Sequence, residues 1–440
     1  MNIRARAACS AYALALLVPV VASAQAPASA PAPPRNPFSD LFGRAPERTG
    51  RAFTAIQFRS SAGAQWGQTL ADGVTPAGTT LPDGLSGGAD ASLVANYTRD
   101  RGKLIAQGTY GYQEYRGDND FGVPSFDIGA RGDLKATTRL VIQGSARYAR
   151  VPFFQSIWMP PDFSDALPIE RSAILLMQND NVEAMAGITH NYSKYGSIEL
   201  TGTMRQTRFT FSPNNDFSAA GALLRWNRHL TRDLAVHFGY GQEEIRQQSI
   251  DGEQRFNYEL LDVGFDYARG FTIARRTTFT FSTQTALIRE TVGPRHFRVN
   301  GGAMFERRFL RSWVSQIYGQ RASAFVPGFR APVLTDTAQF VVAGYLSKRL
   351  LLNLNADGTQ GEVGFENPQQ YATYSGRAKL TFGLTRNFGV FTQYVYSRYQ
   401  NPPDPQTLFA MPEGARQGVT VGVQTFISLF NKEQVPRDPR

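Results

Sequence analysis

Side chains that could do acid–base chemistry are few in this chain. It has four histidines, His190, His229, His237 and His296. A hydrolase would need one of them beside a serine or an aspartate in a fixed geometry, and none of the four stands in a recurring motif. His190, His229 and His237 also lie close to segments interpreted below as tight turns. We therefore expect no catalytic residue.

Candidate metal ligands are equally sparse. Asp118 and Asp120 in "RGDNDFG" resemble the start of a calcium loop, but the remaining ligands of such a loop do not follow. The only cysteine, Cys9, lies inside a predicted signal peptide and would be removed with it. The mature chain would then have no thiol for a disulfide, a metal or a nucleophile. We expect no metal site and no cofactor.

A larger group of charged residues occupies alternate positions in segments whose other face is apolar. Fixed charges placed in this way along a water-filled passage raise the local concentration of their counter-ions. The candidates for lining such a passage are Arg147, Arg205, Arg225, Arg377, Lys379, Glu199, Asp262, Asp266 and Glu306. The excess of bases predicts a preference for anions. The alternative, that these charges pair with one another and solvate a polar interior, stays open.

β-Strands have to position these charges, because the pattern around them has a period of two. Between Leu234 and Gly241, Leu, Val, Phe and Tyr alternate with Ala, His, Gly and Gly. Similar alternation covers 140–148 and 374–382. The apolar faces are rich in Gly and Ala and often end in Tyr, Phe or Trp. This composition is typical of a face turned to lipid rather than to the core of a soluble sandwich.

The composition supports an all-β chain. Among 440 residues there are 41 Gly, 18 Tyr and 31 Phe, and the mean hydropathy is -0.30 although 42% of residues are hydrophobic. We find no long segment of helical period. A chain of this size made almost entirely of strands is expected to form a barrel, a propeller or a repeat array.

The N-terminal segment predicts export. Arg4 and Arg6 precede an apolar run and the small residues Ala22-Ser23-Ala24, so residues 1–24 are interpreted as a signal peptide. Residues 25–50, rich in Pro and Ala, are interpreted as a periplasmic linker. Removing the signal takes away two arginines and no acid, which lowers the formal charge from +10 to +8. The remaining bases form no block and no nucleic-acid-binding motif, so we expect no nucleic-acid partner.

The connections between strands come in two lengths. Eight short ones, such as "LTRD" at Leu230 and "LTRN" at Leu384, alternate with nine longer ones rich in Pro or Asp. Short turns on one side and long loops on the other are typical of bacterial barrels, with the short turns periplasmic. The pattern predicts an antiparallel up-and-down transmembrane β-barrel of about 18 strands (16–18) over residues 51–430, with a periplasmic tail at 431–440. Only at 350–355 does the alternation break, which predicts a short or bulged strand there.

With its signal peptide, alternating strands, "LTRD"-type turns and last strand "GVTVGVQTFISLF", the chain resembles bacterial outer-membrane β-barrel proteins of the porin-like class. The resemblance covers about residues 51–430 and implies an outer-membrane location among lipid and lipopolysaccharide. It also implies insertion by the barrel assembly machinery, which recognises a terminal aromatic. Phe430 would be that residue, but "NKEQVPRDPR" follows it. Both a single chain and a homo-oligomer fit the sequence.

Three functions remain as hypotheses. The preferred one is a porin-like channel for small hydrophilic solutes, because a barrel of 16 to 18 strands encloses water. The second is a non-enzymatic component of a surface or exopolysaccharide export system, and the least favoured is a barrel-embedded hydrolase. In the longest connection, 152–181, the apolar residues Phe153, Phe154, Trp158 and Met159 are expected either to narrow the pore or to form a lid.

Overall fold

A computed structural model describes residues 53–69, 84–115, 121–152, 178–210, 216–231, 234–249, 252–267, 277–289, 295–309, 312–325, 332–364, 368–385, 387–400 and 414–433. The predicted signal peptide and linker lie outside these ranges, as do the four apolar residues Phe153, Phe154, Trp158 and Met159 of the longest connection. The described residues contain no helix that is long and apolar enough to cross a membrane.

The described residues form eighteen strands, the number that the turn pattern predicts. They are β1 (Phe53–Thr69), β2 (Gly84–Arg99), β3 (Gly102–Tyr115), β4 (Phe121–Lys135), β5 (Leu140–Pro152), β6 (Gln178–Ser193), β7 (Gly196–Phe209), β8 (Phe217–His229), β9 (Leu234–Ser249), β10 (Gly252–Tyr267), β11 (Thr277–Arg289), β12 (Arg295–Phe309), β13 (Trp313–Ala324), β14 (Val333–Ser347), β15 (Leu350–Val363), β16 (Gln369–Gly383), β17 (Phe388–Gln400) and β18 (Gly414–Glu433).

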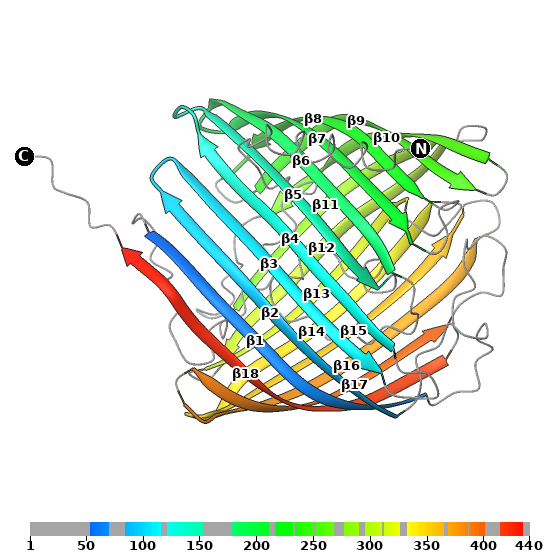
Figure 1. Cartoon of the computed structure of the whole chain (residues 1–440). Coiled ribbons are helices and arrows are strands. Elements are labelled where there is room, and N and C mark those ends of the chain that lie inside the picture. The colour runs from blue at the N-terminus through cyan, green and yellow to red at the C-terminus, as the bar shows by residue number, and fades with distance from the viewer. Residues whose placement is uncertain are drawn as a thin grey trace, which may run out of the picture.

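Every strand pairs antiparallel with its sequence neighbours, and β1 pairs with both β2 and β18, which closes the barrel. Figure 1 shows β1 between β18 and β2 on the near side, with all strands strongly tilted. β18 continues past Phe430, and Glu433 pairs with Phe53. The first and last residues of the barrel therefore lie at the same end, which is also the end of the short hairpins.

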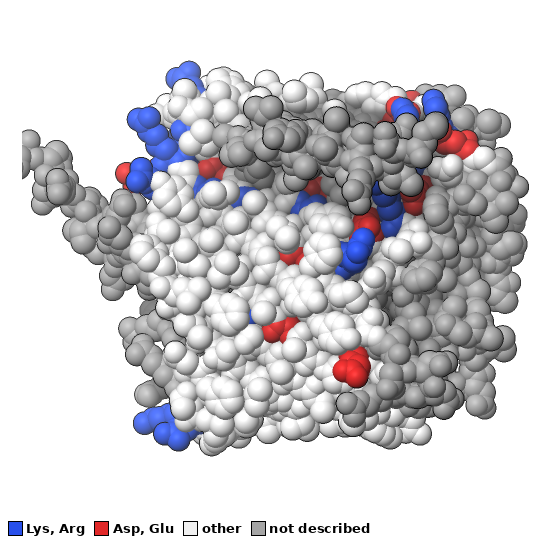
Figure 2. Space-filling view, in the orientation of Figure 1, with Lys and Arg blue, Asp and Glu red and all other residues white. Residues whose placement is uncertain are grey.

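The outward faces are apolar, as the alternation predicts. Exposed side chains include Leu93 on β2, Ile128 on β4, Leu200 on β7 and Val421 on β18. In Figure 2 broad areas of the visible face carry no charged residue, and Lys and Arg gather at the upper left. Because side chains on a strand alternate between the two faces, this outer band leaves the polar residues of the same strands to the interior.

Aromatic pairs and an ion pair mark one edge of the apolar band. At the long-connection end of β4 and β5 the rings of Phe126 and Tyr148 lie 5.2 Å apart. Just beyond them Arg150 donates to Asp180 through Nε at 2.6 Å and through its second nitrogen at 2.9 Å. A solvated charge pair directly above aromatic rings fits the water boundary of a membrane barrel.

Two of the long connections that the sequence predicts, Gln248 to Glu253 and Asp357 to Pro368, lie largely in strands. β9 extends to Ser249, β10 begins at Gly252, and β15 extends to Val363. Gly252 has a φ of 115°, a backbone conformation that a residue with a side chain adopts only with strain. That glycine permits a tight hairpin where the polar sequence suggested a loop.

The irregularity predicted near Leu350 lies on the neighbouring strand. β15 is a full strand of 14 residues, and the register shifts on β14, between Tyr345 and Ser347. Leu351 points inward and packs against Ala343 and Tyr345. The three consecutive leucines thus continue the alternation, and a bulge on the partner strand absorbs the mismatch.

Candidate functional site

The inner wall carries the charged residues that the sequence analysis selected. Arg225 shows the arrangement clearly: its neighbours Leu224 and Trp226 are 53% and 41% exposed on the outer face, whereas Arg225 is 4% exposed. By the same register, inward positions hold Arg147, Arg205, Arg377, Lys379, Glu199, Asp262, Asp266 and Glu306. That these residues line an open pore stays a prediction.

An upper row of charges alternates in sign along the wall from β4 to β9. Arg147, Glu183 and Arg205 stand directly opposite one another on β5, β6 and β7. Arg147 forms a two-nitrogen contact with Asp127, at 2.6 and 3.0 Å, and Arg205 reaches Glu243 at 2.8 Å. The three acids are absent from the predicted set, although the same alternation applied to β4, β6 and β9 would have included them.

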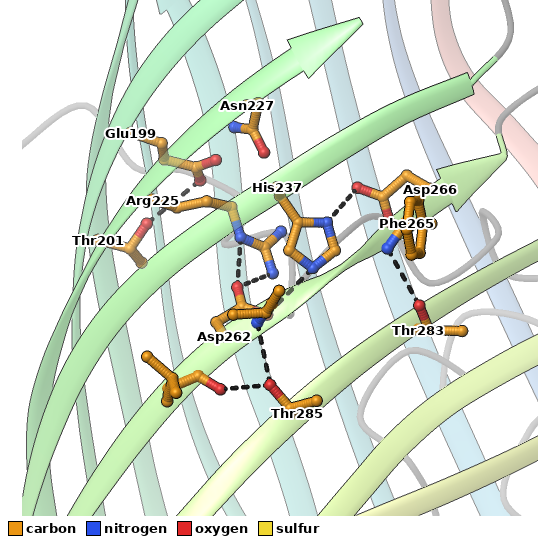
Figure 3. A network of polar contacts seen from close by, with 12 residues as sticks. Glu199, Thr201, Arg225, Asn227, His237, Asp262, Phe265, Asp266, Thr283 and Thr285 are labelled. Carbon is orange, nitrogen blue, oxygen red and sulfur yellow. Dashed lines mark hydrogen bonds and ion pairs between the residues drawn. The ribbon is translucent and has the colours of Figure 1, made fainter. Parts of the chain in front are cut away.

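A lower row, nearer the short hairpins, is more deeply buried. Gln143 on β5 donates to Glu199 on β7 at 3.2 Å, and Thr201 donates to the same carboxylate oxygen at 3.2 Å. Glu199 faces Arg225 in register, and Nε of Arg225 donates to Oδ2 of Asp262 at 2.6 Å. The lower row thus has two contact groups, one on β5 and β7 and one on β8 and β10. Figure 3 shows the Thr201–Glu199 and Arg225–Asp262 contacts as dashed lines.

His237 completes the lower row. Its Nδ1 lies 3.0 Å from Oδ2 of Asp266 and its Nε2 lies 3.1 Å from Oδ1 of Asp262, and the ring is fully buried. The Nδ1 contact has hydrogen-bond geometry, whereas the Nε2 contact is a close approach without it. Arg225, Asp262, His237 and Asp266 thus form a chain of close polar contacts on β8, β9 and β10.

Inward glycines let these side chains reach across an intervening strand. Arg205 and Glu243 lie on β7 and β9, and a Cβ at Gly221 on β8 would come within 3.0 Å of the Cβ of Glu243. Arg225 and Asp262 lie on β8 and β10, and a Cβ at Gly239 on β9 would come within 3.3 Å of the Cβ of Asp262. Each glycine leaves the space that a cross-strand contact occupies.

No family model matches the chain, and no curated protein matches it. Solved structures match it over most of its length. OccK7 (OpdD) of Pseudomonas aeruginosa is 10% identical, over 86% of this chain and 99% of that chain, with a TM-score of 0.44. OpdQ of Pseudomonas aeruginosa is 11% identical over 86% and 98%, with a TM-score of 0.41. The FrpB iron transporter of Neisseria meningitidis is 7% identical over 86% and 82%, with a TM-score of 0.45.

These similarities concern the fold and carry nothing about function. The class of barrel follows from the two faces of its strands. A closed barrel with an apolar outer surface and a charged inner surface can span a lipid bilayer, because its backbone is fully paired and only apolar side chains contact lipid. The protein has the fold of a porin-like outer-membrane β-barrel. In a barrel of this class, charges on the inner wall meet the solute if the lumen is open.

The inner wall carries more charges than the predicted set, and several of them contact a partner. Arg147, Arg205 and Arg225 each contact an acid. Lys379 lies 4.0 Å from the ring centroid of Phe391. Glu306 accepts from Arg308 and Gln316 at 2.9 Å. Further inward charges outside the predicted set are the acids Asp90, Asp127, Asp133, Glu183, Glu243 and Asp357 and the bases Arg59, Arg131, Arg298 and Arg416.

The remaining candidates for chemistry do not come together. His190 is on the outer face of β6, opposite Ile198, and His296 is on β12. His237 has a carboxylate oxygen within 3.1 Å of each ring nitrogen. Within the described ranges no group of three or more His, Cys, Asp or Glu is arranged to hold a metal ion.

Proposed function

We propose that this protein is an outer-membrane channel for the passive passage of small hydrophilic solutes. The observation that carries the proposal is the closed eighteen-stranded barrel with an apolar outer band and two rows of charged and polar side chains inside. Barrels with eight strands fill their interior with side chains, whereas those with 16 to 18 leave room for water. The charged and polar side chains of the inner wall can replace the hydrogen bonds that a hydrated solute loses when it leaves bulk water.

The paired charges support a channel that tolerates both signs of solute. On β4 to β9 acids and bases alternate, so the field of each is reduced within a few ångströms by its partner. A lean to anions, if present, would come from β16, where Arg377 and Lys379 stand on the inner face without an acid at the directly opposite positions, Asn353 and Asn355. Selectivity is therefore part of the proposal and is measured separately from conductance.

The proposal implies a location and partners. The apolar band would face outer-membrane lipid and lipopolysaccharide, and insertion would depend on the barrel assembly machinery. The protein would act as a passive channel, without catalysis. Measurement of the native mass would determine the oligomeric state.

Conductance in a planar bilayer tests the proposal. The purified, folded barrel should give discrete steps of current in KCl. A barrel that shifts in electrophoresis on heating, which demonstrates folding, but conducts no current would reject the channel. That result would favour the alternative of a scaffold or export component.

A further inference from the structure

The contact between β10 and β11 differs from the others in the described barrel. Only Asp266 with Ser282 and Tyr267 with Phe281 are paired along it. On its other side β10 pairs with β9 along the whole of Gly252–Tyr267, and β11 pairs with β12 along the whole of Thr277–Arg289. The next shortest ladder, between β12 and β13, has nine pairs. We call this interrupted contact the β10–β11 seam.

Threonine side chains hold the seam where backbone bonds are missing. The hydroxyl of Thr285 accepts from the backbone N–H of Val263 at 3.1 Å and donates to the carbonyl of Leu261 at 2.7 Å. The hydroxyl of Thr283 accepts from the N–H of Phe265 at 3.0 Å, as Figure 3 shows. These are side-chain contacts on rotatable bonds, and few of them have to break for the two strands to separate.

The short-hairpin end of the seam is pinned. The rings of Tyr267 and Phe281 stack at 5.7 Å with an interplanar angle of 7°. Beside them the carbonyl of Thr283 lies where a Cβ of residue 264 would be, so that β11 fits there only because residue 264 is glycine. Separation of the two strands would therefore start from the other end, toward Gly252.

The inner face of β10 changes character along the seam. Toward the hairpin end it holds Asp266 and Asp262, and then it becomes apolar with Leu260, Tyr258 and Phe256. Phe325, which follows β13, packs on this apolar part at 5.3 Å from the ring of Phe256. Inside the barrel, β10 thus contacts the end of β13, across β11 and β12. This contact draws β10 inward, away from the plane in which it would pair with β11.

The outer face beside the seam is hollowed. A cavity of about 790 Å³ runs from Phe281 and Thr283 on β11 across to Tyr374 on β16. Outward-phased glycines and alanines make its floor: Gly301, Ala303, Gly319, Ala338 and Gly358. The exposed Arg321–Asp336 ion pair also lines the groove, and the apolar part of the groove adjoins the seam through Phe281 on β11.

We propose that the β10–β11 seam is a lateral port, through which an amphipathic solute with an acyl chain passes from the lumen to the lipid-facing groove. The apolar groups on both sides select the chain, and the two hydrogen bonds of Thr285 are the contacts that open. The port depends on the proposed channel in one respect, because the solute must first enter the lumen. It adds a second exit and a second class of solute.

A pair of cysteines tests the port. Apart from Cys9 in the predicted signal peptide the chain has no cysteine, so Val263→Cys with Thr285→Cys would join β10 to β11. The matched control, Phe238→Cys with Val263→Cys, joins β9 to β10 at directly opposite outward positions of an intact ladder. Uptake of fluorescent dodecanoic acid by intact cells and single-channel conductance are measured before and after reduction with dithiothreitol.

We expect the oxidised seam variant to lose uptake of the fatty acid severalfold, to recover it on reduction, and to keep its conductance. The control variant should behave like the parent in both states. Unchanged uptake across a confirmed seam disulfide, a seam pair that never oxidises while the control pair does, or no uptake by the parent would each overturn the port. A folded parent barrel that conducts no current, together with disulfide-sensitive uptake in the seam variant, would instead reject the hydrophilic channel and leave the port.

Discussion

The side chains of Arg225 on β8 and Asp262 on β10 meet across β9, with Nε of the arginine 2.6 Å from Oδ2 of the aspartate. Both are buried, at 4% and 0% exposure, and Gly239 on β9 leaves the space between them. The contact ties together three strands of the wall. It also places two opposite charges where water does not reach them.

Asp262→Ala should destabilise the barrel strongly. Removing one partner of a buried pair leaves the other charge uncompensated, at a cost of about 3–5 kcal/mol. The free energy of unfolding in urea, followed by tryptophan fluorescence in lipid vesicles, measures it. The exposed pair of Arg321 and Asp336 is the control, and Asp336→Ala should cost only about 0–1 kcal/mol. Equal losses at the two sites would show that Asp262 is solvated.

Gly221→Ala should destabilise the upper row of charges. An added Cβ would lie 2.8 Å from the carbonyl oxygen of Gln242 and 3.0 Å from the Cβ of Glu243. Overpacking of this kind costs about 1–3 kcal/mol, measured by the same urea titration. Gly376→Ala is the control because a Cβ there meets nothing within 4 Å. A result in which both variants match the parent would contradict the close packing at Gly221.

The two faces of β18 should respond oppositely to a cation. Val423→Arg places a charge in the middle of the outer band and should reduce assembly, since a lipid-facing Arg at the midplane costs about 2–4 kcal/mol. Gln424→Arg, one residue further and inward, should assemble normally. Heat-modifiable mobility in electrophoresis reports the folded fraction. The reverse order of the two variants would mean that the inside and outside of the barrel are exchanged.

Epitope tags should report the orientation of the barrel in the membrane. A tag inserted between Gln400 and Gly414, in the connection of β17 and β18, should bind antibody on intact cells. A tag inserted between Ser193 and Gly196, in the hairpin of β6 and β7, should bind only after the outer membrane is permeabilised. Labelling of the second tag alone on intact cells would invert the topology.

Selectivity should depend on β16. If Arg377 and Lys379 set the field in the lumen, a KCl gradient should give a reversal potential of the anion-preferring sign, and charge reversal of both to Glu should shift it toward cations. The effect should weaken as salt rises, because exposed charges are screened over about 10 Å at 0.1 M. A parent channel without preference would mean that the cross-strand ion pairs neutralise the wall.

The sequence by itself determined the strand class, the strand number and the face on which each residue lies. The face of each residue follows from the period of two that covalent geometry imposes on every strand. It can therefore be predicted without knowing which strand lies beside it. Arg225 between Leu224 and Trp226 is an example, since its inward position needs no tertiary information. The turn pattern extends the same local logic to the count of eighteen.

Tertiary structure alone decided which inward residues touch. Register and strand tilt bring Arg225 to Asp262 across β9, 37 residues apart in sequence, and an inward Gly239 permits the contact. The pairing of the wall charges was hidden for the same reason, because a charge count does not show which acids stand opposite which bases. The β10–β11 seam was equally hidden: the alternation continues through Val263 and Phe265 whether or not a neighbour bonds to them, since side-chain phase is local whereas ladder pairing depends on the path of the other strand.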